Sequence, residues 1–248
     1  MTTPTSEPCA DIAIPPAEDP RRWHRQRRFW RWALRTVGLR AFARVAAVEG
    51  LEHVPRRGPA LVYYNHIAFT DPLVLLGFLP LATTPLAKVE AFHYPLIGVL
   101  PRLWGAIPVR RGETDKRAIR RTLVALAAGE LVLIAPEGTR NPTLQRARPG
   151  LAYFALRCQV PLVPAAVDGT EGYPTLPLLP RWWREPRARV RFGRPFRLEG
   201  PRRAPTAVLQ AMTDEAMYVL ADLLPPHRRG VYAHGRPTQW RYVRWLEA

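Results

Sequence analysis

Residues 60–71 read Ala60-Leu61-Val62-Tyr63-Tyr64-Asn65-His66-Ile67-Ala68-Phe69-Thr70-Asp71 and join an apolar run to a polar turn. The run at 60–64 is short and continuous, which predicts a buried strand. Pro72 follows directly, and proline is favoured at the first position of a helix, so we expect a helix over 72–79. The stretch therefore predicts a strand, a turn and a helix in succession, with His66 in the turn.

The same alternation of apolar runs and helical segments continues along the chain after Gly50. We expect strands at 60–64, 83–88, 106–110, 131–135, 161–167 and 188–192, and helices at 72–79, 114–128, 148–158 and 204–224. Alternation at this spacing predicts an α/β fold, a single domain with a largely parallel mixed sheet flanked by helices. Residues 169–187 are rich in glycine, proline and tryptophan and predict a long surface loop.

The N-terminal part of the chain has a different composition. Residues 1–20 contain five prolines and predict a disordered leader, while residues 46–248 form the expected α/β domain. Residues 21–45 between them combine arginine and tryptophan at helical spacing, which predicts a basic amphipathic helix or helix pair. Such a segment suits an anionic membrane surface. The alternative is a helix packed on the domain with its arginines in solvent.

Charge and composition restrict the function further. The 248-residue chain carries a formal net charge of +17, which favours an anionic partner: nucleic acid, acidic lipid or a phosphorylated substrate. All of its basic residues except Lys88 and Lys116 are arginine, so a compositional bias also contributes. Neither a secretory signal nor an uninterrupted apolar stretch of about 18 residues is present, so we expect a protein that lies on a membrane without spanning it. The two cysteines, Cys9 and Cys158, do not indicate a disulfide framework and favour a reducing compartment.

His66 and Asp71 are the first candidate catalytic residues. A histidine beside a carboxylate can act as a general base whose tautomer the acid fixes. Five positions along one helix would not place them on one face, so they meet only if His66 precedes a helix that begins near Asp71. The alternative is that Asp71 is a helix N-cap and His66 an ordinary loop residue. A serine nucleophile in the domain is excluded, because Ser6 is the only serine.

Three further apolar runs carry candidate binding residues. Gly105 to Arg111 ends in Arg110 and Arg111, and Leu131 to Arg140 ends in Glu137, Gly138, Thr139 and Arg140. Arginines after strands of an open α/β sheet point into its ligand crevice, and a guanidinium suits phosphate. The alternatives are solvated charges and a capped turn. Val160 to Ala165 is framed by prolines and predicts either a pocket wall or ordinary core.

In this order the four segments resemble the four motifs of the glycerolipid acyltransferases, the family of bacterial 1-acyl-glycerol-3-phosphate acyltransferases. Asn65, His66 and Asp71 match the first motif, Arg111 is similar to the arginine of the second, and residues 137–140 match the third. Lys88 stands where the family often has a lysine. The family often has serine where this chain has Ala68. The resemblance covers roughly residues 46–195 and implies His66 and Asp71 as catalytic residues.

The resemblance also implies the reaction and its partners. His66 would take a proton from a lysophospholipid hydroxyl, which attacks an acyl thioester directly, with neither a cofactor nor a metal. Arg111, Lys88 and Arg140 would hold the acceptor phosphate, with Glu137, Gly138 and Thr139 shaping the site and Asn65, Arg110 and Gly105 as further candidates. The expected acceptor is 1-acyl-glycerol-3-phosphate; glycerol-3-phosphate, lyso-ornithine lipid and a glycolipid are alternatives.

The resemblance implies acyl-CoA or acyl-ACP, the acylated form of acyl carrier protein, as the thioester donor, and the expected location is the cytoplasmic face of a membrane. Two functions of other classes also account for parts of the sequence. A nucleic-acid-binding protein would explain the charge but not the four motifs. A lipid-binding scaffold without catalysis would not need His66 and Asp71 together.

Overall fold

A computed structural model describes residues 9, 11–39, 44–80, 82–95, 98–171 and 188–247. Its centre is a mixed sheet with the strand order β1-β7-β6-β2-β5-β3-β4, extended beside β6 by β8 and then β9. The strands are β1 (Val45–Glu49), β2 (Ala60–Tyr64), β3 (Thr83–Lys88), β4 (Ile107–Val109), β5 (Leu131–Ile134), β6 (Leu162–Asp168), β7 (Ala188–Phe192), β8 (Phe196–Leu198) and β9 (Val243–Trp245).

The centre of this sheet is parallel, and one side of it is antiparallel. Strand β2 pairs in parallel with both β5 and β6, and β3 pairs in parallel with β5 and β4. Strand β7 runs antiparallel to β6 but parallel to β1, and β8 is antiparallel to β6 and β9. The α/β prediction is confirmed, and all six expected strands are present. Strands β1, β8 and β9 were not expected.

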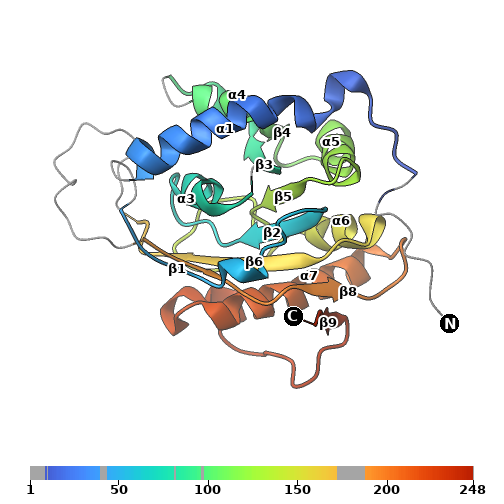
Figure 1. Ribbon diagram of the computed structural model, residues 1–248. Helices are drawn as coiled ribbons and strands as arrows, with labels where there is room; N and C mark the ends of the chain where they lie inside the picture. The colour runs from blue at the N-terminus through green and yellow to red at the C-terminus, as the bar shows by residue number, and fades with distance from the viewer. Residues whose placement is uncertain are drawn as a thin grey trace.

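Helices cover both faces of the sheet. They are α1 (His24–Ala33), α3 (Asp71–Phe78), α4 (Val99–Trp104), α5 (Lys116–Ala127), α6 (Gly150–Cys158) and α7 (Thr206–Leu223). Figure 1 shows α7 across the sheet from α1 and α3. Short 3₁₀ turns lie at Pro16–Glu18, Pro20–Trp23, Leu51–His53, Val89–Phe92, Pro226–Arg228 and Gly230–Tyr232. Helix α4 was not expected, and the predicted loop at 169–187 lies outside the described residues from 172 onward.

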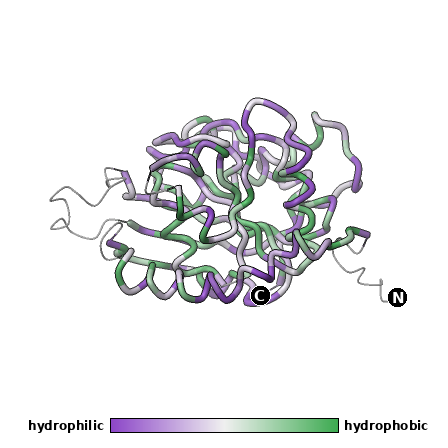
Figure 2. Tube along the Cα trace, turned by 90° about the horizontal axis from the view of Figure 1, so that it is seen from above, coloured by the Kyte–Doolittle hydropathy of each residue, from purple (hydrophilic) through white to green (hydrophobic). Residues whose placement is uncertain are grey.

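Alternate residues of the central strands belong to two separate cores. In β2, Leu61 and Tyr63 pack against α5, α6 and α7, whereas Val62 and Tyr64 pack against α3. This follows from the two-residue period of a strand, and it explains why a strand buried on both faces is apolar throughout. Along the outer helices, by contrast, hydrophobic and hydrophilic positions alternate (Figure 2).

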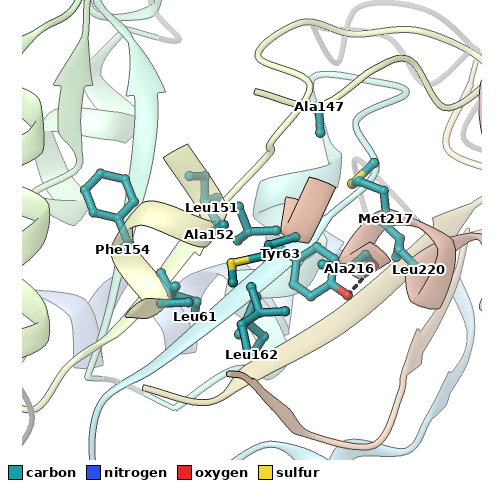
Figure 3. Packing of buried hydrophobic residues seen from close by; sticks show 14 of the residues in the cluster. Leu61, Tyr63, Ala147, Leu151, Ala152, Phe154, Leu162, Ala216, Met217 and Leu220 are labelled. Carbon is teal, nitrogen blue, oxygen red and sulfur yellow. Dashed lines mark hydrogen bonds between the residues drawn. The ribbon is translucent and has the colours of Figure 1, made fainter. Parts of the chain in front are cut away.

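The first core is built around the ring of Tyr63. Its neighbours come from β2, α6 and α7 and include Leu61, Leu151 and Met217 (Figure 3). The fully buried hydroxyl donates a 2.7 Å hydrogen bond to the Ala216 carbonyl oxygen, which satisfies the polar end of the side chain. The contact fixes α7 against the strand that leads to His66.

The N-terminal helix is held to the domain by a buried charge. Arg27 of α1 is fully buried and donates to the Trp104 carbonyl oxygen at 2.9 Å, to Thr84 Oγ1 at 2.9 Å and to Glu130 at 2.7 Å. His24 contacts the other Glu130 carboxylate oxygen at 2.5 Å. The amphipathic helix was expected at 21–45, and α1 with the π-helical turn Leu34–Gly38 occupies part of that range. Neither interpretation of this segment predicted that Arg27 would be buried against the domain.

The described part of the leader lies on the domain, which differs from the expectation of disorder. Ile12 packs against the first core, Asp11 pairs with Arg157 of α6 at 2.5 Å, and Glu18 pairs with Arg120 of α5. Cys9 is buried and forms a disulfide with Cys158 at the end of α6. The 149-residue separation of the cysteines gives no sign of this pairing, because it depends on where the leader packs.

Candidate active site

The candidate residues lie where parallel strands end. The turn with His66 follows β2, Lys88 is the last residue of β3, Arg110 and Arg111 follow β4, and Glu137 follows β5. These four strands are mutually parallel neighbours in the order β2-β5-β3-β4. Their carboxyl ends therefore meet at one edge of the sheet, where ligands bind in open α/β folds.

His66 and Asp71 are in direct contact. The His66 Nδ1 atom lies 2.9 Å from Asp71 Oδ2, and the Asp71 side chain is fully buried while that of His66 is 14% exposed. A carboxylate at Nδ1 holds the proton there and leaves Nε2 as the unprotonated nitrogen. The pair is thus arranged as a general base with its orienting acid.

Asp71 also holds the turn that contains the histidine. Its Oδ2 atom accepts hydrogen bonds from the backbone amides of Ile67 at 2.6 Å and Ala68 at 2.7 Å. Helix α3 begins at Asp71 with Thr70 as its N-cap, so these amides belong to the preceding turn and not to the helix. The simple N-cap alternative is therefore wrong: one oxygen both folds the turn and orients the imidazole.

Two further candidates support the structure of this edge. The Asn65 side chain donates from Nδ2 to the Val167 carbonyl oxygen and accepts at Oδ1 from the Val167 backbone N–H, each at 2.8 Å. These two hydrogen bonds join the end of β2 to β6. Gly105 precedes β4, at the opposite end of that strand from Arg111. Its φ is +67°, and a Cβ there would come within 2.6 Å of the Trp23 ring. Asn65 thus joins two strands through its side chain, and Gly105 allows the Trp23 ring to pack against the turn before β4.

Glu137 faces inward toward the His66 turn. It is 6% exposed; Oε1 accepts from the His66 amide at 3.3 Å and Oε2 from the Gln145 amide at 2.7 Å. Burial raises the pKa of this carboxyl from 4.5 to about 7, although the two amide hydrogen bonds oppose the shift. With one oxygen engaged by each of two backbone amides, Glu137 holds the His66 turn in place.

This raised pKa predicts a pH dependence of stability that Glu137→Gln removes. Between about pH 4.5 and 7 the unfolded chain loses its proton while the folded protein keeps it, so the wild-type free energy of unfolding falls as pH rises. Relative to Glu137→Gln, we expect wild type to lose about 3 kcal/mol between pH 4.5 and 8. Urea unfolding at both pH values measures the free energy of unfolding of the two proteins. If the difference between them is the same at pH 4.5 and pH 8, the prediction is wrong.

Three arginines follow β4 and β5, at the edge of the sheet that also carries the His66 turn. The pKa of the Arg111 guanidinium is lowered by desolvation; Glu90 opposes this shift, while the charges of Arg140 and Arg148 add to it. Arg111, Arg140 and Arg148, here called the arginine cluster, therefore act on one another electrostatically. Arg148 Nε also lies 3.5 Å from the position of a Cβ on Gly138, beside the turn that carries Arg140. Like charges held together repel unless an anion joins them. The cluster is therefore a candidate site for phosphate.

Arg110 and Arg111 are both exposed, but Arg110 has different neighbours. Its side chain is 72% exposed and lies 4.0 Å from Glu113, an exposed pair of little energetic weight. Its backbone amide donates to Asp115 at 2.9 Å and so helps to form the turn before α5. Of the two arginines that follow β4, Arg111 is the one in the cluster.

Lys88 is held at the rim of the same site. Its Nζ donates to the Tyr94 hydroxyl at 2.9 Å, and the pKa of that phenol is lowered by Lys88 and also by the nearby Arg140. Gly138 has φ +72°, a left-handed conformation that favours glycine, and the position of its absent Cβ is 3.5 Å from Arg148 Nε, so Arg148 lies beside this turn. Thr139 is exposed, with no hydrogen bond or other contact described for its side chain.

Arg148 is the candidate that the sequence interpretation missed. It lies two residues before α6, and its backbone amide donates to the Pro136 carbonyl oxygen at 3.0 Å. The sequence contains one indication of this residue. A cation near the N-terminal end of a helix interacts unfavourably with the helix dipole, so an arginine at that position is not explained by helix stability. The contact of Asn141 was missed as well: its backbone N–H donates to the His66 carbonyl oxygen at 2.7 Å.

An α/β sheet with a histidine–aspartate pair and an arginine cluster at one edge is the site that the glycerolipid acyltransferase resemblance implies. A comparison with known families agrees, because the Acyltransferase family matches residues 45–168. The chain belongs to this family.

Curated relatives support the same conclusion. A 1-acyl-sn-glycerol-3-phosphate acyltransferase of Bacillus subtilis is 31% identical over 123 residues, 49% of this chain and 62% of that protein. One of Limnanthes alba is 30% identical over 131 residues, 50% of this chain and 45% of its own length. A lyso-ornithine lipid O-acyltransferase of Pseudomonas aeruginosa is 36% identical over 115 residues, 45% of this chain and 44% of that protein. The match thus spans about half the length of the curated relatives.

A solved structure shares the fold. The crystal structure of the 1-acyl-sn-glycerophosphate acyltransferase PlsC from Thermotoga maritima superposes with a TM-score of 0.59, covering 79% of this chain and 80% of that one at 24% identity. Within the described residues, no helix has the length and apolar character needed to cross a membrane.

Proposed function

We propose that this protein transfers a fatty acyl group from an acyl thioester to the hydroxyl of a lysophospholipid, with 1-acyl-glycerol-3-phosphate as the first choice. The observation that carries the proposal is the His66–Asp71 contact at 2.9 Å beside the arginine cluster. It combines a base for a hydroxyl with cations for the phosphate of the same molecule. Family membership and the names of the relatives support it.

The reaction needs no covalent enzyme intermediate. His66 Nε2 takes the acceptor proton as the hydroxyl oxygen attacks the thioester carbonyl carbon, and Asp71 stabilises the imidazolium that forms. The tetrahedral intermediate then expels the thiolate, the carbon–sulfur bond breaks, and the imidazolium returns its proton to sulfur. The products are the ester and the free thiol of coenzyme A or of acyl carrier protein.

An acceptor screen tests the proposal directly. Purified protein with acyl-CoA or an acylated acyl carrier protein is offered 1-acyl-glycerol-3-phosphate, glycerol-3-phosphate, lyso-ornithine lipid and a glycolipid, and the products are identified by mass. Phosphatidate as the main product supports the proposal. If lyso-ornithine lipid alone is acylated, the acceptor is the one named for the Pseudomonas aeruginosa relative and not 1-acyl-glycerol-3-phosphate. Retention on DNA without transfer to any acceptor would favour a nucleic-acid-binding protein.

Arg111→Ala should weaken binding of a phosphorylated acceptor. A hydrogen bond to a charged group contributes about 1.5–3 kcal/mol, so we expect the KM for 1-acyl-glycerol-3-phosphate to rise about 10–100-fold. The matched control is Arg110→Ala, the adjacent arginine outside the cluster. Steady-state kinetics with saturating thioester measures both variants. Equal effects of the two substitutions would contradict the assignment of phosphate to Arg111.

The outer face of the N-terminal helix supports a peripheral membrane contact. Phe29, Trp32 and Val37 are 56%, 62% and 64% exposed, and exposed Arg25, Arg28 and Arg35 lie among them. Apolar side chains that enter the headgroup region, with arginines that meet lipid phosphate, are typical of interfacial helices. We place this contact at the cytoplasmic face, where the protein would meet both substrates.

Removing the two aromatic rings should reduce binding to anionic vesicles. Each ring contributes about 1.5–3 kcal/mol when fully buried and less at an interface, so we expect Phe29→Ser with Trp32→Ser to lower vesicle affinity at least tenfold. Trp245→Ser is the control, because this tryptophan is 41% exposed on β9, on the opposite side of the molecule (Figure 1). Vesicle flotation measures all three proteins. Unchanged flotation of the double variant would locate the membrane contact elsewhere.

A further inference from the structure

The segment that follows α7 lies outside the residues matched by the family, yet it packs on the loop beside His66. The Leu144 amide donates to the Arg228 carbonyl oxygen at 2.9 Å, and the Val231 amide donates to the Leu144 carbonyl oxygen at 3.1 Å. Gly230 has φ +49°, and a Cβ there would collide with the Leu144 carbonyl. The two segments are therefore in close backbone contact over several residues.

One buried side chain ties this contact to the sheet. The Arg228 guanidinium, 9% exposed, donates to Asp168 at 2.8 Å, to the Pro142 carbonyl oxygen at 3.1 Å and to Glu171. Asp168 is the last residue of β6, and Pro142 belongs to the loop that follows β5. The planar guanidinium group has several N–H donors and can hold three acceptors in fixed directions, whereas the ammonium group of a lysine cannot reproduce that geometry.

The other side of the same loop holds the candidate base. Residues 137–148, here called the clamp loop, contact both backbone polar groups of His66: Glu137 accepts from its amide, and Asn141 donates to its carbonyl oxygen. The clamp loop also carries Arg140 and Arg148 of the arginine cluster. The position of the loop therefore affects the base and the phosphate site together.

We propose that Arg228 is a positioning residue that holds the clamp loop against Asp168 and so sets the distance between His66 and the phosphate of the acceptor. The inference rests on the proposed function, because it names a residue that supports that reaction without touching the substrate. A displacement of about 1 Å at a reacting group lowers a rate about 10²-fold. Loss of Arg228 therefore affects turnover and acceptor binding, not folding alone.

The test compares Arg228→Ala and Arg228→Lys with Arg236→Ala, which removes an exposed pair with Asp222. Per folded molecule, we expect Arg228→Ala to lower kcat/KM for the phosphorylated acceptor about 10–100-fold, with the KM for the thioester unchanged. Arg228→Lys should recover part of the loss, and Arg236→Ala should match wild type. Wild-type kcat and KM for folded Arg228→Ala would overturn the proposal.

Hydrogen exchange provides a readout that does not depend on the substrate. Peptides covering residues 137–148 should exchange faster in Arg228→Ala and remain unchanged in Arg236→Ala; equal exchange in both would also overturn the proposal. If Arg228→Ala does not fold, Asp168→Asn with Glu171→Gln removes the two charges that hold the guanidinium and is measured in the same way. A wild-type protein that acylates no acceptor would refute the proposed function, while the exchange data would still decide whether Arg228 holds the loop.

Discussion

His66→Ala is expected to lower kcat for acyl transfer about 10²–10⁴-fold while the protein stays folded. Among the described groups in contact with Asp71, the imidazole is the one that can take a proton from a hydroxyl, and the described contacts of its ring are with Asp71 and the Tyr64 ring. The turn itself is held by Asp71 through the amides of Ile67 and Ala68, so removing the ring leaves those bonds in place. Product formation under saturating acceptor and thioester measures the loss.

Two comparisons make this result specific. His234→Ala removes an exposed histidine that takes part only through its backbone oxygen, which accepts from Tyr218, and should match wild type. Asp71→Asn keeps an oxygen for the turn but removes the charge that stabilises the imidazolium, so its loss should approach that of His66→Ala. If His66→Ala kept wild-type turnover, the general-base mechanism would be wrong, whatever the effect of Asp71→Asn.

The parts of this fold that the sequence predicts are those that local patterns encode. Strands β2 and β3 begin and end at the expected residues: β2 is a continuous apolar run, and β3 begins shortly after Pro80 and ends at Lys88. The start of α3 followed from Pro72, and with it the meeting of His66 and Asp71. Strands β1, β8 and β9 depend on distant partners, such as the pairing of Val48 with Val190, and no local pattern specifies them.

Side-chain direction was the part of the site that could not be read from the sequence. Glu137 and Arg140 belong to one four-residue motif, yet the first is 6% exposed and points at a backbone amide while the second is exposed. The sequence also does not show that Arg228 and Glu130 are buried, because charged residues are usually exposed. A charge is buried only where partners far along the chain satisfy it, so its burial depends on the tertiary structure.

Glu130 is where the largest effect on stability is expected. Its carboxylate accepts from Arg27 at 2.7 Å and from Thr84, and it lies 2.5 Å from His24. Glu130→Ala would leave the fully buried Arg27 guanidinium without its counter-ion, at a cost of about 3–5 kcal/mol of unfolding free energy. Burial already lowers the pKa of Arg27, an effect that the Glu130 charge opposes. Urea unfolding of the purified protein measures the loss.

A control variant and a rescue variant distinguish the effect of an unpaired buried charge from the loss of an ordinary exposed ion pair. Glu49→Ala removes a partner of Arg191 in a pair that is about half exposed on both sides, and it should cost less than about 1 kcal/mol. Replacing both buried partners, Arg27→Met with Glu130→Leu, should recover most of the loss, because no unpaired charge then remains. A cost for Glu130→Ala as small as that for Glu49→Ala would mean that water reaches Arg27. The contact would then not hold α1, and the exposed Phe29 and Trp32 would lack the fixed support that their proposed membrane role requires.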